Sequence, residues 1–251
     1  MISINITYYN EPHFLKWWYS FNQRLLDQGC DVILNIGDDG SQERPASAFF
    51  EKNKPQDNIR LFRVKEDIGF NSHGTRNLLM QQTTTDWNLL SDIDRRYTDR
   101  TLFSIYENEE GLKQGFYYSF WETIQSSPDR FSVNDYLVHK DDFWKTGGYD
   151  EEFVNIHFGD RYFLDTLRMF ARRKKVKQWE VKYIRGARDV TWSDNVTKTI
   201  YPDDKSLIHP NSVWGNQEKR FALKELVLQR NKTEEGRKSK KVINFEWERV
   251  F

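Results

Sequence analysis

Residues 32–41 read Val-Ile-Leu-Asn-Ile-Gly-Asp-Asp-Gly-Ser, an apolar run that ends in two aspartates, Asp38 and Asp39. A second apolar run, residues 87–91, ends in Asp92-Ile93-Asp94. Both runs are typical of buried β-strands, and in open α/β sheets ligands bind in the crevice outside the carboxyl ends of the strands. We therefore expect the two acidic clusters to meet at one site, although they lie far apart in the sequence.

Strand and helix patterns alternate through the first part of the chain. We expect strands at residues 2–8, 31–36, 59–64 and 87–91, and helices at residues 12–28, 43–52 and 73–82. Pro12 suits the first position of its helix behind an Asn cap, and Gly29 suits its end. This alternation predicts an α/β fold in which helices flank a central mixed, mostly parallel sheet.

The pattern changes after residue 99. We expect helices at residues 100–109, 141–145, 160–172 and 216–230, and strands at residues 116–121 and 136–139. The mostly polar segment 122–134 is predicted to be a long irregular loop, a kind of segment that is often functional. A length of 251 residues fits one large domain with two functional halves.

Charge and composition exclude several classes of protein. The 38 basic and 38 acidic residues cancel, which removes the electrostatic argument for a nucleic-acid partner. Residues 236–241 form a basic run that we expect to be a solvated tail, with at most weak attraction to anionic membranes. Cys30 is the only cysteine, and neither a signal peptide nor a transmembrane segment is evident, so we expect a cytoplasmic protein.

The chain lacks the Walker A, Gly-x-Gly-x-x-Gly and His-Glu-x-x-His motifs, so P-loop, dinucleotide and zincin chemistry have no support. Other short motifs follow one another between residues 2 and 172. They are Tyr8-Tyr9-Asn10-Glu11, Asp38-Asp39-Gly40-Ser41, Arg76-Asn77, Asp92-Ile93-Asp94, Gly147-Gly148-Tyr149-Asp150-Glu151 and Gly159-Asp160. Together and in this order they resemble the family 2 glycosyltransferases of the GT-A fold.

The resemblance implies a donor site at the strand ends. It implies that the Tyr-Asn turn and the Asp-Asp-Gly-Ser acids bind the base and ribose of a nucleotide sugar, with Asp39 on uracil and Asp38 in support. It also implies that Arg76 contacts the diphosphate and Asp92 the ribose. The implied donor-binding residues are Tyr8, Asn10, Glu11, Asp38, Asp39, Arg76 and Asp92.

The Asp-x-Asp motif is the candidate metal site. Residues two apart on a strand point to the same side, and carboxylate oxygens suit Mn²⁺ or Mg²⁺. The resemblance assigns the metal to Asp94 with Asp92 beside it, and His209 is a candidate late ligand, as in some relatives. Arg95 and His157 are left without an assigned role.

Asp160 has two interpretations. An aspartate just before an apolar helix is a conventional N-cap. Gly159-Asp160 also resembles the family segment whose aspartate is the catalytic base of inverting transfer, and the preceding Gly-Gly-Tyr-Asp-Glu turn favours that role. Four aromatic residues lie in segments suited to stacking on an acceptor sugar: Tyr117, Tyr118, Trp121 and Trp144.

The resemblance therefore implies a metal-dependent, inverting glycosyltransferase of the hexosyltransferase type, which moves a sugar from a UDP-sugar to a hydroxyl of a carbohydrate or glycoconjugate. We expect a nucleotide-sugar-binding half at residues 1–99, an acceptor and catalytic half at 100–215, and a C-terminal helix with a basic tail at 216–251. One alternative is a sugar nucleotidyltransferase, whose usual Gly-rich first loop this chain lacks. The other is a non-catalytic carbohydrate- or nucleotide-binding protein of the same fold, which turnover would exclude.

Overall fold

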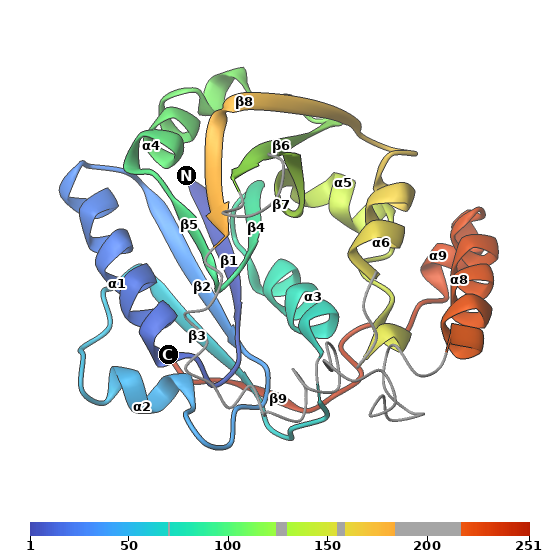
Figure 1. The fold of residues 1–251 in the computed structure, drawn as a ribbon, viewed down its shortest axis with the longest axis horizontal. Coiled ribbons are helices and arrows are strands. Elements are labelled where there is room, and N and C mark those ends of the chain that lie inside the picture. Colours follow the sequence, from blue (N-terminus) through green and yellow to red (C-terminus); the bar gives the residue numbers. More distant parts are fainter. Residues whose placement is uncertain (70, 124–129, 155–158, 184–216) are drawn as a thin grey trace.

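The computed structural model describes residues 1–69, 71–123, 130–154, 159–183 and 217–251. Within these ranges a sheet runs through the molecule in the order β5-β8-β6-β7-β4-β1-β2-β3-β9 (Figure 1). The strands are β1 (Ile2–Tyr8), β2 (Val32–Asp38), β3 (Ile59–Val64), β4 (Trp87–Asp92), β5 (Arg95–Tyr97), β6 (Phe116–Thr123), β7 (Arg130–His139), β8 (Arg172–Tyr183) and β9 (Trp247–Arg249). The helices are α1 (Pro12–Asp27), α2 (Ala46–Phe50), α3 (Ser72–Gln82), α4 (Asp99–Glu107), α5 (Lys140–Lys145), α6 (Gly159–Leu167), α8 (Gln217–Asn231) and α9 (Glu234–Lys238).

The centre of the sheet is parallel, as the alternation of strands and helices predicts. Strands β3, β2, β1 and β4 are neighbours in that order, and each is joined to the next in sequence by a helix. The register pairs Tyr8 with Asp38 and Thr7 with Asp92, so the two acidic strand ends lie at the same edge. The strand order reverses beside β1, which is where open α/β sheets bind ligands.

The second half differs from the sequence-based expectation in three places. The predicted loop 122–134 is wrong in part, because β6 continues to Thr123 and β7 begins at Arg130. Helix α6 ends at Leu167 rather than at residue 172, and the chain then enters β8. Only Val176, Trp179 and Val181 of β8 are buried apolar residues, and their uneven spacing conceals the strand pattern.

The C-terminal segment is integrated with the rest of the fold. Strand β9 pairs antiparallel with β3 at the edge of the sheet, and the ring of Phe251 packs edge-on against Phe50. The Lys240 ammonium is buried between the Gly148 carbonyl, at 2.8 Å, and the Asp150 carboxylate. The expectation of a solvated basic tail is therefore wrong for this residue.

Apolar side chains fill both sides of the sheet. One cluster lies where α1 and α4 pack and includes Trp18, and another lies where α5 and α6 pack and includes Phe163. Figure 1 shows these two groups of helices flanking the sheet. Of the helices that the structure describes, none is both long and apolar enough to span a membrane.

Candidate functional site

Asp38 holds the loop that follows β2. Its carboxylate accepts hydrogen bonds from the backbone N–H groups of Ser41, at 2.9 Å, and Ala46, at 2.7 Å. Gly40, which directly precedes Ser41, has φ +77°, and a Cβ there would lie 2.6 Å from the Glu66 carbonyl oxygen. The conformation therefore requires glycine, and Asp38 acts on the shape of the candidate donor site.

Asp39 ties the same loop to the start of α3. Its buried carboxylate accepts hydrogen bonds from the Asn71 N–H, at 2.8 Å, and from the Thr75 hydroxyl, at 2.9 Å. Burial raises the pKa of Asp39 to about 7, although both hydrogen bonds oppose the shift. This carboxyl therefore changes its charge near neutral pH.

Tyr8 and Asn10 brace the loop from the end of β1. The Tyr8 hydroxyl donates to the Arg44 carbonyl, and the Asn10 side-chain oxygen accepts from the Arg44 N–H at 2.9 Å. Asn10 does not cap α1 as predicted, because its backbone is left-handed, with φ 53°, and Glu11 occupies the cap position. The Glu11 carboxylate instead lies 3.2 Å from His13 Nδ1.

Arg76 brings residues from three elements together. Its guanidinium is 1% exposed and donates to Asp92 Oδ1 at the end of β4, at 2.6 Å, and to Asp160 in the first turn of α6. It also donates to the Tyr149 hydroxyl, at 2.8 Å, and to the Asn134 carbonyl, at 3.2 Å. Since Asp39 contacts α3 one residue earlier, this helix links both acidic clusters to Asp160.

Asp160 lies inside the first turn of α6, so it is not the residue that precedes the helix, and its side chain points to α3. Burial alone would raise the pKa of Asp160, but the charge of Arg76 and the nearby His73 hold it well below its usual range. His73 Nε2 is 3.6 Å from Asp160 Oδ2, and the His73 ring stacks on Tyr149 with centroids 5.1 Å apart. In the protein as described, Asp160 is ionised and paired.

Arg95 is the second buried guanidinium at this edge. It lies 2.7 Å from Glu122 Oε1 and 3.2 Å from Asp135 Oδ2, and within 3.7 Å of both Asp92 and Asp94. Burial would lower the pKa of Arg95, but the four carboxylates raise it. Arg95 therefore stays charged and balances the Asp-x-Asp motif.

The excess of negative charge at this edge of the sheet can be balanced by a divalent cation. No set of three or more His, Cys, Asp and Glu side chains forms a ready metal cluster in the described part of the chain. A cation that clamps a diphosphate needs only one or two protein carboxylates. Carboxylates here outnumber the guanidinium groups of Arg76, Arg95 and Arg130; they are Asp92, Asp94, Glu122, Asp135 and Asp160. The side chains of Asp92 and Asp94 are 26% and 20% exposed, so both are accessible to a cation.

The structure also places residues that the sequence leaves without a role. His73 and Asn134 contact Asp160 and Asp92, respectively, and the spacing of His73 three residues before Arg76 is the signal that puts both on one helix face. Tyr117 and Tyr118 are buried in the core, which excludes them from stacking on an acceptor. His157 and His209 lie outside the described residues.

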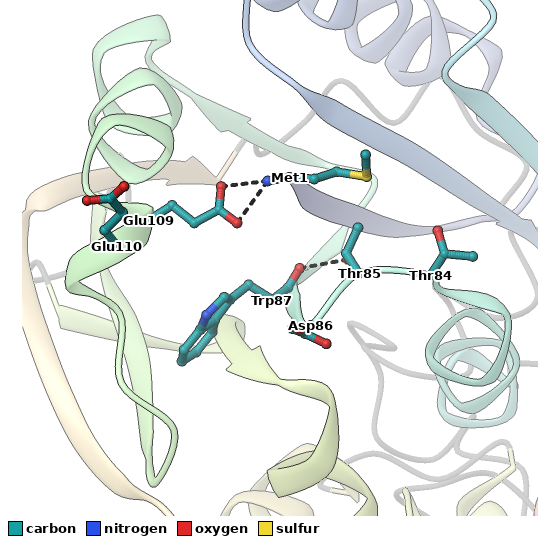
Figure 2. Close-up of a pocket in the computed structure, with 7 residues that line it drawn as sticks. All are labelled: Met1, Thr84, Thr85, Asp86, Trp87, Glu109 and Glu110. Carbon is teal, nitrogen blue, oxygen red and sulfur yellow. Dashed lines mark hydrogen bonds and ion pairs between the residues drawn. The ribbon is translucent and has the colours of Figure 1, made fainter.

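A hollow of about 460 Å³ lies at the opposite edge of the sheet, where β1 and β4 begin (Figure 2). Its lining includes Trp87 and Glu110, and the Met1 amino group forms an ion pair with Glu109 beside it. Because Asp92 is at the other end of β4, this hollow is separate from the candidate active site.

The sequence matches no protein-family model and no curated protein. The fold, however, is similar to that of solved glycosyltransferase structures. One is the mannosyltransferase PcManGT from Pyrobaculum calidifontis in complex with GDP-Man and Mn²⁺, with a TM-score of 0.52 and 14% identity over 75% of this chain and 58% of that one. Another is S. aureus TarS 1-349, with a TM-score of 0.59 and 14% identity over 90% of this chain and 69% of that one. Full TarS gives the same score and identity, and there the match spans 42% of its length. The architecture of this chain is thus the GT-A type of α/β fold.

Proposed function

We propose that this protein is a glycosyltransferase that uses a nucleotide sugar as donor and a hydroxyl of a carbohydrate or glycoconjugate as acceptor. The observation that carries the proposal is the Arg76 bridge, because it joins Asp92, at the strand end expected to hold the donor, to Asp160, on the helix expected to face the acceptor. The fold type and the Mn²⁺ and GDP-Man in the PcManGT structure support a nucleotide sugar and a divalent cation.

In this proposal the donor lies across the carboxyl ends of β1, β2 and β4. Asp39, whose carboxylate is hydrogen-bonded to the start of α3, faces the base. The loop after β2 is fixed around the base by Tyr8, Asn10 and Asp38. Asp94 and Asp92 would hold Mn²⁺ or Mg²⁺, which when bound neutralises charge that develops on the departing diphosphate. A UDP-sugar is the donor that the sequence resemblance favours.

Asp160 is proposed as the base of an inverting transfer. It accepts the proton of the acceptor hydroxyl, whose oxygen attacks the anomeric carbon from the face opposite the leaving nucleotide. The pair with Arg76 keeps Asp160 ionised, and it also makes the carboxylate a weak base. A shift of Arg76 from Asp160 toward the donor's diphosphate would raise the basicity of Asp160, so donor binding and base strength would be coupled through one guanidinium.

Nucleotide binding tests the proposal without knowledge of the acceptor. UDP with Mn²⁺ at a hundred times its dissociation constant should stabilise the protein by about 2.7 kcal/mol, which raises the melting temperature by roughly 5–10 °C. Asp94→Ala should remove the Mn²⁺-dependent part of this shift, and Asp31→Ala, which removes an exposed aspartate elsewhere, should keep it. If GDP raises the melting temperature and UDP does not, the base is guanine and the uracil assignment is wrong. If no nucleotide raises the melting temperature, the proposed function is contradicted.

A further inference from the structure

Strand β8 carries a concentration of positive charge that the neutral chain as a whole does not suggest. Six of its 12 residues are Lys or Arg, and Glu180 is the only acidic one. Side chains alternate between the two faces of a strand, so Arg173 and Lys175 lie on one face, about 6.6 Å apart, and Lys177 follows them where the ladder with β6 shifts register. Figure 1 shows β8 as a long bent strand that begins beside α6.

No carboxylate of the described residues neutralises these cations. In the ranges that the structure describes, none of Arg173, Lys175 and Lys177 forms an ion pair with a carboxylate, and both lysines are exposed. By contrast, Arg76 and Arg230 are each held by two carboxylates. The unpaired row therefore has charge to offer to a ligand.

Two aromatic rings lie directly under this row. Lys175 Nζ is 5.3 Å from the centre of the Phe131 ring, and Lys177 Nζ is 5.3 Å from the centre of the Trp121 ring. The two rings meet edge to face with centroids 4.9 Å apart, and both are half-buried. We call Trp121, Phe131, Arg173, Lys175 and Lys177 the basic-aromatic surface. A sugar ring packs its C–H face on an aromatic ring, and its charged substituents reach neighbouring ammonium groups.

Hydrogen bonds join Arg173 of the basic-aromatic surface to β6 and β7, and β7 reaches the candidate active site. Arg173 donates to the Ser119 hydroxyl, at 2.8 Å, and to the Ser132 carbonyl, at 3.3 Å. Two residues further along β7, Asn134 donates to Asp92 Oδ2 at 2.9 Å and accepts from Arg76 through its carbonyl. A chain bound on the surface would thus extend toward the carboxylates of the candidate active site.

We propose that the basic-aromatic surface binds an acceptor that is an anionic carbohydrate chain, with phosphate or carboxylate groups along its length. This inference rests on the proposed glycosyltransferase function and specifies its acceptor class. The succession of cations along one strand matches a linear polymer with repeated charges. An anionic membrane is the less suitable occupant, because the rings are half-buried between cations and do not project as apolar anchors.

Binding to three polymers of one backbone tests the inference: dextran, carboxymethyl dextran and phosphorylated dextran. The wild type should bind one or both charged forms at least tenfold more tightly than dextran at low salt. Lys175→Gln/Lys177→Gln should weaken that binding about tenfold and reduce its salt dependence, because two charge contacts are lost. Lys52→Gln/Lys54→Gln removes two exposed lysines near α2 and should change the affinity less than twofold.

Trp121→Ala separates recognition of a sugar from recognition of bare charge. It should weaken binding of the charged dextrans several-fold and leave binding of inorganic polyphosphate unchanged. Equal affinity for charged and neutral dextran, or binding only to vesicles of anionic phospholipid, would overturn the inference. UDP binding by the same wild-type sample is measured in parallel. A protein that binds UDP but no charged dextran loses the acceptor assignment alone, whereas one that binds charged dextran but no nucleotide contradicts the proposed function.

Discussion

Replacing Arg76 with methionine tests whether one buried guanidinium organises the candidate site. The side chain is 1% exposed and contacts two carboxylates, a tyrosine hydroxyl and a carbonyl. Loss of one partner from a buried ion pair costs about 3–5 kcal/mol. Asp92 and Asp160 are 26% and 21% exposed and keep some hydration, so we expect the lower end of that range.

A loss of about 3 kcal/mol lowers the melting temperature of a chain of this size by roughly 6–12 °C. Urea unfolding at pH 7.5 gives the free-energy difference, with Arg100→Met as the control, because Arg100 is exposed on α4. The free energy of unfolding of Arg100→Met should lie within about 0.5 kcal/mol of the wild-type value. The double variant Arg76→Met/Asp160→Asn should be more stable than the sum of the single changes predicts, because the unpaired Asp160 charge is gone.

The pH dependence of the stability difference between the wild type and Arg76→Met gives a second check on the role of Arg76. In the wild type the pKa of Asp160 is lowered, so its contribution to stability is present above the unfolded pKa of about 4 and is lost as pH falls through the folded value. Without Arg76, burial raises that pKa, and the variant gains stability as pH falls. The difference between the two proteins should therefore narrow from pH 7.5 to pH 4.5. A difference under 1 kcal/mol at pH 7.5, or one that widens at low pH, would refute the role given to Arg76.

Three further changes address other parts of the account. Asp160→Asn should lower the transfer rate by about 10²–10⁴ while UDP binding persists, and a normal rate would exclude the base role. The pKa of Asp39 in the folded protein is about 7, above its unfolded value, so its contribution to stability is lost as pH rises from about 4 to 7. Asp39→Asn should therefore gain stability relative to the wild type between pH 5 and pH 8. A stability difference that stays constant over this range would contradict the assignment. Gly40→Ala should cost at least about 2 kcal/mol in urea unfolding, whereas Gly111→Ala, where no atom lies within 4 Å of the added carbon, should be nearly neutral.

Sequence patterns are sufficient for the parallel half of the fold because β1, β2 and β4 are buried at almost every position, and the apolar residues of β3 are buried too. The predicted strand 59–64 matches β3, and the predicted helix at 73–82 begins within a residue of α3. The two acidic motifs lie at one edge, as the apolar runs before them indicate. Strand β8 is not evident from the sequence because lysines and arginines fill its exposed positions and its ladder with β6 shifts register after Phe120.

The partners of each charge could not be read from the sequence. Arg76 and Asp160 are 84 residues apart, and the local sequence around Asp160 favours a helix cap. That pairing depends on how α3 and α6 pack against the sheet. Because of this pairing, Asp160→Asn removes a charge contact and should reduce stability in addition to rate.

Turnover of nucleotide sugars tests the central claim most directly. The protein is incubated with a panel of UDP- and GDP-sugars, with Mn²⁺ or with a chelator, and the release of free nucleotide is measured. We predict that at least one UDP-sugar releases UDP in a Mn²⁺-dependent reaction that Asp160→Asn slows by about 10²–10⁴. No metal-dependent release from any donor, by a protein that is folded and binds UDP, would contradict the assignment as a glycosyltransferase.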